Sequence, residues 1–262
     1  MKIGPSNITT QGLLRTLRRN IHLYIFVRRF AVVLSKYFFL EEGFAFLKNI
    51  SHDPEAVALD IGSNDGTSIA LIRKAKPNSY IHSFDPVHKI HERIYNHKFH
   101  NLGLSSKIGT LDFFVPTVTG YELTQYASTH KEKVIDRIYK DFGKDVIDIS
   151  FRKVTSEVST VDLLKLKPFF IKVDVEGHEL EVLKGASETI RIFKPILLLE
   201  IQDFTQYEEL RDFLSTFSYS LCKWPKHAHI ANFQFAFQYS DGQTNYVWIS
   251  KESSKTWKFS DL

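Results

Sequence analysis

The segment from Val57 to Gly66, with the sequence VALDIGSNDG, constrains the fold of this chain more than any other stretch. Its apolar first half is typical of a buried central strand in a parallel sheet. Gly62 and Gly66 end this strand and allow the backbone to approach a ligand closely. The residues from Thr67 to Ile72 then predict a helix whose first N–H groups face that ligand. The segment therefore predicts a strand, a binding loop and a helix in succession.

A second apolar strand is predicted at Tyr80–Phe84, and Asp85 and Pro86 follow it directly. This spacing places a carboxylate about one strand-helix-strand unit after Asp60, where nucleotide-binding sheets hold the acid that binds ribose hydroxyls. Asp85 is equally suited to form a turn before Pro86. The sequence leaves both roles open for this side chain.

The polar character of the loop indicates what kind of ligand it binds. The dinucleotide fingerprint has a middle glycine that gives room for a pyrophosphate, but Asn64 stands at that place between Gly62 and Gly66. With Asp60 and Asp65, the loop is acid-rich and suits a ligand that carries positive charge and an amino group. S-adenosylmethionine carries a sulfonium, an ammonium group and a ribose, and it is the expected cofactor.

Further pieces of the sequence follow this loop in a characteristic order. The pieces are Leu59–Gly66, Phe84–Pro86, Asn101–Ser105 and Phe170–Glu179, the last followed by Val182–Ala186. Together they resemble the FkbM-type S-adenosylmethionine-dependent methyltransferases, and the fourth piece is the most specific. The resemblance extends from Val57 to Ile249 and implies a class I methyltransferase fold.

The resemblance also implies which residues contact the cofactor. Besides the loop and Asp85, Leu104 and Ser105 of the third piece are expected to contribute. This chain has Asp85 where the family usually has Glu, and its segment between Pro86 and Asn101 is shorter than usual. Both departures affect the side of the site where the adenine is expected.

The carboxyl end of the fourth predicted strand, Phe169–Val173, is followed by several groups capable of acid–base chemistry. Ligands of open parallel sheets bind outside the carboxyl ends of the strands, so Asp174, Glu176 and His178 are the candidate catalytic residues. Asp174 is the preferred base or acceptor anchor, because an unpaired carboxylate at the end of a buried strand is costly. Glu176 and Glu179 also suit the positive end of the helix that follows.

The remaining elements predict a doubly wound sheet with an antiparallel edge. A helix running to Lys194, a fifth strand at Ile196–Ile201 and a helix at Tyr207–Phe217 continue the alternation. The alternating segments Tyr219–Cys222, Phe233–Tyr239 and Tyr246–Ile249 then predict antiparallel strands at one edge.

The middle of the chain is harder to interpret. We expect a short helix from Val87 to His97, a third strand at Lys98–Leu104 and an added strand at Gly109–Val115. His88, His91 and His97 have spacings that a metal site could use, but no acids converge with them and no metal is expected.

The region 116–150 is a long polar and aromatic insertion beside the carboxyl edge of the sheet. Long loops are often functional, so the insertion is either a site of acceptor recognition or a plain surface excursion. Within it, Ala127 and Ser128 match a short Ala-Ser pair of the family. After it, the segment Val158–Leu164 resembles the family's short helix before the fourth strand, with Ser159 or Thr160 able to cap it.

The first 50 residues differ in character from residues 51–262, which are assigned to the methyltransferase domain. They carry a net charge of +6 while the whole chain carries +4, so the basic excess lies outside that domain. Leu23 to Tyr37 fits an amphipathic helix, with Arg28 and Arg29 interrupting the apolar run, so a membrane span and a signal peptide are both disfavoured. The helix packs on the sheet or on a second subunit of a homo-oligomer, or it lies on an anionic membrane surface. The first alternative is favoured, because such helices usually cover a core.

Composition sets the remaining bounds. A chain of 262 residues suits one large α/β domain with an appendage. The single cysteine, Cys222, excludes an internal disulfide and indicates a reducing compartment, so the expected location is cytoplasmic or peripheral to a membrane. Nucleic acid is a poor substrate candidate, because no basic and aromatic groove pattern lies within the domain.

The sequence thus predicts an S-adenosylmethionine-dependent methyltransferase. The acceptor is expected to be a hydroxyl oxygen of a sugar, a glycan or another small metabolite, on the strength of the resemblance. A nucleotide-binding scaffold without turnover, bound to a membrane or a protein partner, is the alternative. A nicotinamide-dependent oxidoreductase is a weaker third, because the loop departs from the dinucleotide fingerprint.

Overall fold

A computed structural model describes residues 42–48, 50, 56–89, 95–144, 148–223, 234–235 and 245–252. The amphipathic helix predicted at Leu23–Tyr37 lies outside these residues, and so does most of the strand predicted at Phe233–Tyr239. Among the helices that the structure describes, none has the length and apolar character needed to cross a membrane.

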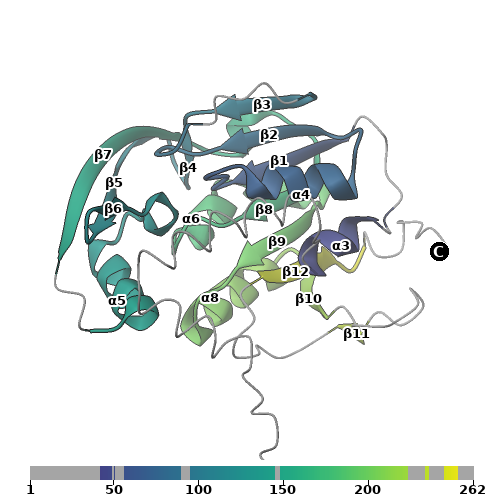
Figure 1. Ribbon diagram of the computed structural model, residues 1–262. Coiled ribbons are helices and arrows are strands. Elements are labelled where there is room, and N and C mark those ends of the chain that lie inside the picture. The colour runs from purple at the N-terminus through teal and green to yellow at the C-terminus, as the bar shows by residue number, and fades with distance from the viewer. Residues whose placement is uncertain are drawn as a thin grey trace, which may run out of the picture.

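The described residues form a main sheet with the strand order β11-β10-β12-β9-β8-β1-β2-β3 (Figure 1). Its strands are β1 (Val57–Ile61), β2 (Tyr80–Phe84), β3 (His97–His100), β8 (Pro168–Val173), β9 (Ile196–Glu200), β10 (Tyr219–Lys223), β11 (Gln234–Phe235) and β12 (Asn245–Ser250). The neighbouring strands β9, β8, β1, β2 and β3 pair in parallel, whereas β12, β10 and β11 add an antiparallel edge. The predicted doubly wound sheet with an antiparallel edge is confirmed.

Helices cover both faces of the main sheet. The elements α3 (Glu42–Lys48) and α4 (Thr67–Ala75) pack on one face, where Ile69 and Ile72 contact the sheet. The elements α6 (Glu179–Lys184), α7 (Ser187–Phe193) and α8 (Phe204–Ser215) cover the other face, where Leu183 and Leu210 are buried. From β1 the chain runs outward to β2 and β3, and it later returns to β8 on the other side of β1. The carboxyl ends of β1 and β8 therefore form the topological switch point, where ligands bind in such sheets.

A second, smaller sheet lies beside the main sheet, with the strand order β4-β7-β5-β6 (Figure 1). Its strands are β4 (Gly103–Leu104), β5 (Gly109–Val118), β6 (Tyr121–Glu122) and β7 (Ile149–Ser159). The 3₁₀-helix η1 (Thr124–Tyr126) and the helix α5 (Lys131–Phe142) pack on it around the buried side chains of Val118, Leu123 and Ile138. The insertion at 116–150 thus contains a hydrophobic core of its own.

The sequence predicted one strand at Lys98–Leu104, and this prediction is wrong. The run is divided between β3 in the main sheet and β4 in the second sheet. Asn101 lies at the division, where its side-chain amide donates a hydrogen bond of 2.9 Å to the carbonyl oxygen of Asp85. A Cβ on Gly103 would stand 2.8 Å from Cγ1 of Val158, so the close pairing of β4 with β7 depends on this glycine.

The helix predicted from Val87 to His97 is wrong at both of its described ends. Residues 87–89 are not helical because the N–H groups of Val87 and His88 donate to the Asp85 carboxylate in a tight turn. His97 instead begins β3, where its Nε2 lies 2.7 Å from Oγ of Ser83. His91 lies outside the described residues, so the structure does not test the spacing of the three histidines.

Two further differences concern the flanks of β8. The segment Val158–Leu164 ends β7 and then forms the 3₁₀-helix η2 (Asp162–Leu164), with Oγ1 of Thr160 accepting a hydrogen bond from the N–H of Leu163. The predicted single helix after β8 is divided into α6 and α7 at Gly185, where a Cβ would collide with the carbonyl oxygen of Ser105.

Candidate active site

The loop after β1, residues 62–66, is called the β1 loop here and has an unusual backbone. Gly62, Asn64 and Gly66 all have positive φ, of 79°, 41° and 78°. The N–H of Gly62 donates to the carbonyl oxygen of Phe84 at 2.9 Å. A Cβ on Gly62 would collide with the carbonyl oxygen of Asp174, so the β1 loop lies directly against the chain that leaves β8. Glycine at this position is required by both its φ and its surroundings.

Two polar groups of the β1 loop differ in how they are satisfied. Oδ1 of Asp65 accepts hydrogen bonds from the N–H and the hydroxyl of Thr67, at 3.0 and 2.7 Å, and so holds the start of α4. Ser63 is 2% exposed, and its buried hydroxyl has no hydrogen-bond partner among the described residues. A buried hydroxyl without a partner costs free energy, and a bound ligand would relieve that cost.

Asp85 follows β2 and closes against the β1 loop. Its Oδ2 accepts a hydrogen bond from the N–H of Asn64 at 2.9 Å. Its Oδ1 accepts from the N–H groups of Val87 and His88, at 2.9 and 2.7 Å. Burial raises the pKa of Asp85, although these backbone hydrogen bonds act in the opposite direction. The turn-forming role that the sequence allowed is therefore present, and the carboxylate lies at the rim of the same loop.

Asp60 is fully buried beneath the β1 loop rather than at its surface. Its Oδ2 accepts a hydrogen bond of 2.6 Å from Oγ of Ser68, in α4. Its Oδ1 lies 3.4 Å from Nζ of Lys172, which also lies 3.2 Å from Oδ2 of Asp174. Burial acts to lower the pKa of Lys172, but Asp174 and Asp60 outweigh it and raise that pKa. Lys172 is thus a buried cation that joins the ends of β1 and β8.

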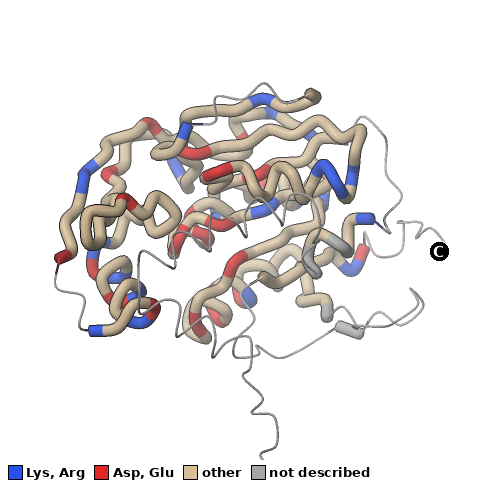
Figure 2. Tube along the Cα trace, in the orientation of Figure 1, with Lys and Arg blue, Asp and Glu red and all other residues tan. Residues whose placement is uncertain are grey.

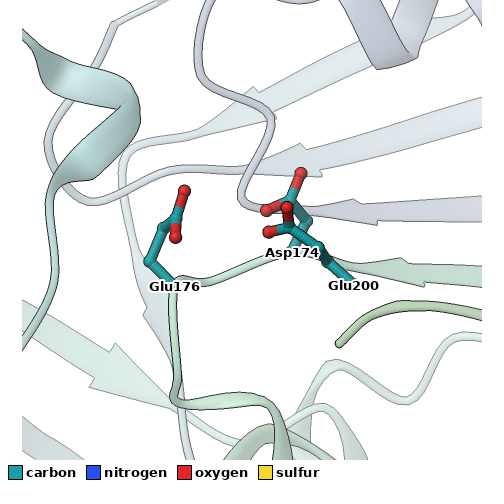
Figure 3. Close-up of side chains that lie close together, drawn as sticks. All are labelled: Asp174, Glu176 and Glu200. Atoms are coloured by element: carbon teal, nitrogen blue, oxygen red, sulfur yellow. The ribbon is translucent and has the colours of Figure 1, made fainter. Parts of the chain in front are cut away.

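The turn after β8, residues 174–178, is called the β8 turn here and contains all three predicted catalytic residues, Asp174, Glu176 and His178. Oxygen atoms of Asp174, Glu176 and Glu200 lie within 4.8 Å of one another. Figure 3 shows the carboxyl groups of Asp174 and Glu200 close together, with Glu176 projecting from the same turn. The backbone takes φ of 57° at Glu176 and 94° at Gly177 to form this turn. Acidic residues gather in this part of the molecule (Figure 2).

The two carboxyl groups of Asp174 and Glu200 influence each other strongly. Burial acts to raise the pKa of Asp174, but Lys172, a hydrogen bond with Glu200 and the charge of Arg137 together lower that pKa. Burial and the neighbouring Asp174 raise the pKa of Glu200 well above its ordinary value. The Asp174 side chain is 33% exposed and that of Glu200 13% exposed, so Asp174 is the one that a ligand reaches.

Glu176 is held by two partners from other elements. The guanidinium of Arg137, in α5, forms an ion pair with its carboxylate, and the side-chain amide of Gln202 donates to Oε2 at 2.5 Å. Arg137 also lies 3.8 Å from Oε1 of Glu200 and over the ring of Tyr126. Three acids could in principle hold a divalent cation, but here a guanidinium already faces two of them.

His178 and Ser105, predicted for different roles, are in contact. Nε2 of His178 lies 2.9 Å from Oγ of Ser105, and burial lowers the pKa of this histidine. Leu104 is 4% exposed and belongs to the main core.

Glu179 is fully buried, and its Oε1 accepts hydrogen bonds from the N–H groups of Val175 and Gly177, at 3.0 and 3.2 Å. Glu179 therefore stabilises the β8 turn by binding two of its backbone N–H groups.

The insertion contacts the switch point through side chains of η1, α5 and the loop between them. Oγ1 of Thr124 donates to Oδ1 of Asn64 at 3.2 Å, and Oγ of Ser128 donates to the carbonyl oxygen of Glu176 at 2.8 Å. With the ion pair of Arg137, these bonds place the insertion over the carboxyl edge of the main sheet. The sequence identified Ser128 but gave no signal for Thr124 or Arg137.

The sequence also missed Glu200 and Lys172 as members of the site. Both stand in apolar runs that predict buried strands, Ile196–Ile201 and Phe169–Val173. A charged residue in such a run is as costly as Asp174 at the end of its strand. The signal that singled out Asp174 could therefore have found both of them.

A family model described as "Methyltransferase FkbM domain" matches residues 60–239. The chain belongs to the FkbM methyltransferase family. This membership confirms the resemblance stated from the sequence, and the main sheet is accordingly that of a Rossmann-like class I methyltransferase.

Individual proteins similar to this FkbM-family chain are also known. The hexuronic acid methyltransferase AglP of Haloferax volcanii is 31% identical over 147 residues. The match takes in 53% of each protein, so this chain spans about half the length of that relative.

Two solved structures are similar as well. The methyltransferase FkbM of Methylobacillus flagellatus KT has a TM-score of 0.47 at 16% identity, over 90% of this chain and 57% of that one. The precorrin-6y C5,15-methyltransferase of Geobacter metallireducens GS-15 has a TM-score of 0.32 at 12% identity, over 94% of this chain and 91% of the other.

Proposed function

We propose that this FkbM-family protein transfers a methyl group from S-adenosylmethionine to a hydroxyl oxygen of a sugar or glycan. The observation that carries the proposal is the position of Asp174. Asp174 follows β8 at the switch point, its backbone carbonyl lies against Gly62 of the β1 loop, and its side chain is 33% exposed. A ligand in the β1 loop and an acceptor at the β8 turn would therefore be neighbours.

The β1 loop fits the cofactor. Gly62 and Gly66 leave a surface without side chains, and the hydroxyl of Ser63 has no partner among the described residues to compete with a ligand. When bound, S-adenosylmethionine supplies an electrophilic methyl group on a sulfonium. Asp65 supports the loop through Thr67, and Asp60 supports it from below.

Asp85 suits one ribose hydroxyl better than two. A carboxylate offers about four acceptor positions, and backbone N–H groups occupy three of them here. One position on Oδ2 remains for a hydroxyl in this arrangement. Asp85 therefore binds the ribose and shapes the β1 loop at the same time.

Among the three predicted catalytic residues, Asp174 is the best placed base. Lys172 keeps its carboxylate ionised, whereas the Glu176 carboxylate is held by Arg137 and Gln202. The ring of His178 is directed at Ser105, with its Nε2 2.9 Å from the serine Oγ. A positioned base contributes about 100- to 10,000-fold to proton transfer from a hydroxyl group that reacts poorly at neutral pH.

The sugar class of the acceptor rests on the relative and on the insertion. AglP is named for hexuronic acid, a sugar that carries both hydroxyl groups and a carboxylate. The insertion (residues 116–150) lies over the β8 turn through Ser128 and Arg137, where an acceptor would have to enter. We assign acceptor recognition to it.

Calorimetric titration with S-adenosylhomocysteine and with NAD tests this function against its alternatives. We expect binding of S-adenosylhomocysteine and none of NAD. Binding of NAD alone would indicate an oxidoreductase. Binding of S-adenosylhomocysteine, without methyl transfer to any sugar, would indicate a scaffold that kept the fold but lost turnover.

A further inference from the structure

The carboxyl groups of Asp174 and Glu200, called the carboxyl pair here, are neighbours because of the strand register. β8 pairs in parallel with β9, with Val173 opposite Leu199, so the next residue of each strand reaches the same edge of the sheet. Oε2 of Glu200 is buried and has no hydrogen-bond partner among the described residues unless a proton joins it to Asp174. Two carboxyl groups at this separation do not both ionise easily.

The charged groups around the carboxyl pair increase this difficulty. They are Lys172 and Asp60 from the sheet, Arg137 from α5, Glu176 from the β8 turn and Glu179 from α6. Lys172 is shared with Asp60, and Arg137 is shared with Glu176. Each of the two cations is thus already balanced by an acid outside the carboxyl pair. Two surplus negative charges therefore remain when both members of the pair are ionised, and a proton shared between them removes one of the two.

We propose that Asp174 and Glu200 act as one proton-binding unit that takes up the acceptor's proton, with Glu200 as a positioning residue behind Asp174. This inference rests on the proposed function. The acceptor oxygen forms the new C–O bond while the C–S bond of the sulfonium breaks and its electron pair stays on sulfur. The acceptor's proton moves to the Asp174 carboxylate and is then shared with Glu200.

The reactive form of the carboxyl pair is the one in which both members are ionised. Repulsion between them gives this form a higher proton affinity than Asp174 beside Lys172 would have alone. Activity should therefore rise with pH as the pair loses its last proton. Glu200→Gln keeps the shape of the neutral side chain but removes the second ionisation, so the remaining Asp174 is a weaker base.

Proton release on cofactor binding tests the carboxyl pair without any acceptor. S-adenosylmethionine carries a sulfonium and S-adenosylhomocysteine does not, so only the first should expel the shared proton. Calorimetry in two buffers with different ionisation enthalpies, from about pH 6 to about pH 9, counts the protons. We expect the wild type to release more protons with S-adenosylmethionine, and Glu200→Gln to show no difference between the two ligands. Glu188→Gln, at an exposed ion pair with Arg191, is the matched control.

Equal proton release with both ligands, or a difference that survives in Glu200→Gln, would overturn the inference that the carboxyl pair binds the proton as one unit. Binding of neither ligand would instead contradict the proposed function. Failure of the carboxyl-pair inference and failure of the proposed function therefore give different results in this experiment.

The pH dependence of turnover adds a second test, with a hexuronic acid glycoside and a neutral glycoside as acceptors. Glu200→Gln should bind S-adenosylhomocysteine as the wild type does, lose about 100-fold in kcat and lose the rise of kcat with pH. An unchanged pH profile in Glu200→Gln would contradict the inference, because a merely structural role leaves the profile in place. Lack of transfer by the wild type would contradict the proposed acceptor. The proton-release experiment, which needs no acceptor, would then be the test of the carboxyl pair.

Discussion

Gly62 and Asp174 are in direct backbone contact, although they are 112 positions apart in the chain. The N–H of Asp174 donates to the carbonyl oxygen of Ile61 at 3.0 Å, and a Cβ on Gly62 would collide with the carbonyl oxygen of Asp174. Any side chain at Gly62 must therefore displace the β8 turn as well as the β1 loop. The β1 loop and Asp174, the proposed base, are therefore held together by backbone contacts at this point.

We expect Gly62→Ala to abolish S-adenosylhomocysteine binding and to lower the free energy of unfolding by about 3 kcal/mol or more, because it adds a collision to the strain of a positive φ. Gly120→Ala is the matched control. Gly120 has φ of 80°, but nothing lies within 4 Å of its Cβ position, so only about 1–2 kcal/mol should be lost. Calorimetry and urea unfolding measure both effects. Equal effects of the two substitutions would show that the contact with Asp174 is unimportant.

Asp85→Ala should weaken S-adenosylhomocysteine binding at least tenfold, since a hydrogen bond to a charged group contributes about 1.5–3 kcal/mol. The substitution also frees the N–H of Asn64, which Asp85 now holds. Asp112→Ala, at an exposed carboxylate paired with Lys153, should leave affinity unchanged. The measurement is calorimetry on protein whose circular dichroism shows that it is folded. Unaltered affinity in folded Asp85→Ala would exclude the ribose role.

Lys172→Met should lower the free energy of unfolding by about 3–5 kcal/mol, because it leaves Asp60 buried without its cation. Adding Asp60→Asn should recover part of this loss, since the uncompensated charge is then absent. Urea unfolding of the two single variants and the double variant gives the coupling energy. Strictly additive losses would mean that the Lys172–Asp60 pair is not the link between β1 and β8.

Glu179 should make stability fall as pH rises. Burial raises the pKa of Glu179 to about 7, so in the folded state it keeps a proton that the unfolded chain loses near its ordinary pKa. The folded state binds more protons between these two values, and the free energy of unfolding should fall across this window by up to about 3 kcal/mol. Glu179→Gln should remove this fall, whereas Glu181→Gln, at a partly exposed ion pair with Lys184, should not. A fall of the same size in Glu179→Gln would assign it to other groups.

The elements nearest the site were predictable because their signals are local. β1, the β1 loop and β2 follow from one apolar run, two glycines and a second apolar run. Asp174 stood out because a carboxylate ends a buried strand. Glu200 carries the same signal, because it is a charged residue within the apolar run Ile196–Ile201.

What could not be predicted depends on contacts between distant segments. β7 alternates charged and apolar residues over Ile149–Ser159, and it is a strand because it pairs along the whole of β5. The division of Lys98–Leu104 depends on Gly103 meeting Val158. Arg137 gave no signal, because its role is set by where α5 packs rather than by its neighbours in sequence.

Methyl transfer itself tests the central claim most directly. S-adenosylmethionine with a deuterated methyl group would be incubated with hexuronic acid and neutral sugar glycosides, and the products analysed by mass spectrometry before and after mild base. We predict a base-stable methyl ether from the wild type and from Asp112→Asn, and a loss of about 100-fold or more in Asp174→Asn with cofactor affinity retained. A base-labile methyl ester, or wild-type turnover in Asp174→Asn, would contradict hydroxyl methylation with Asp174 as the base.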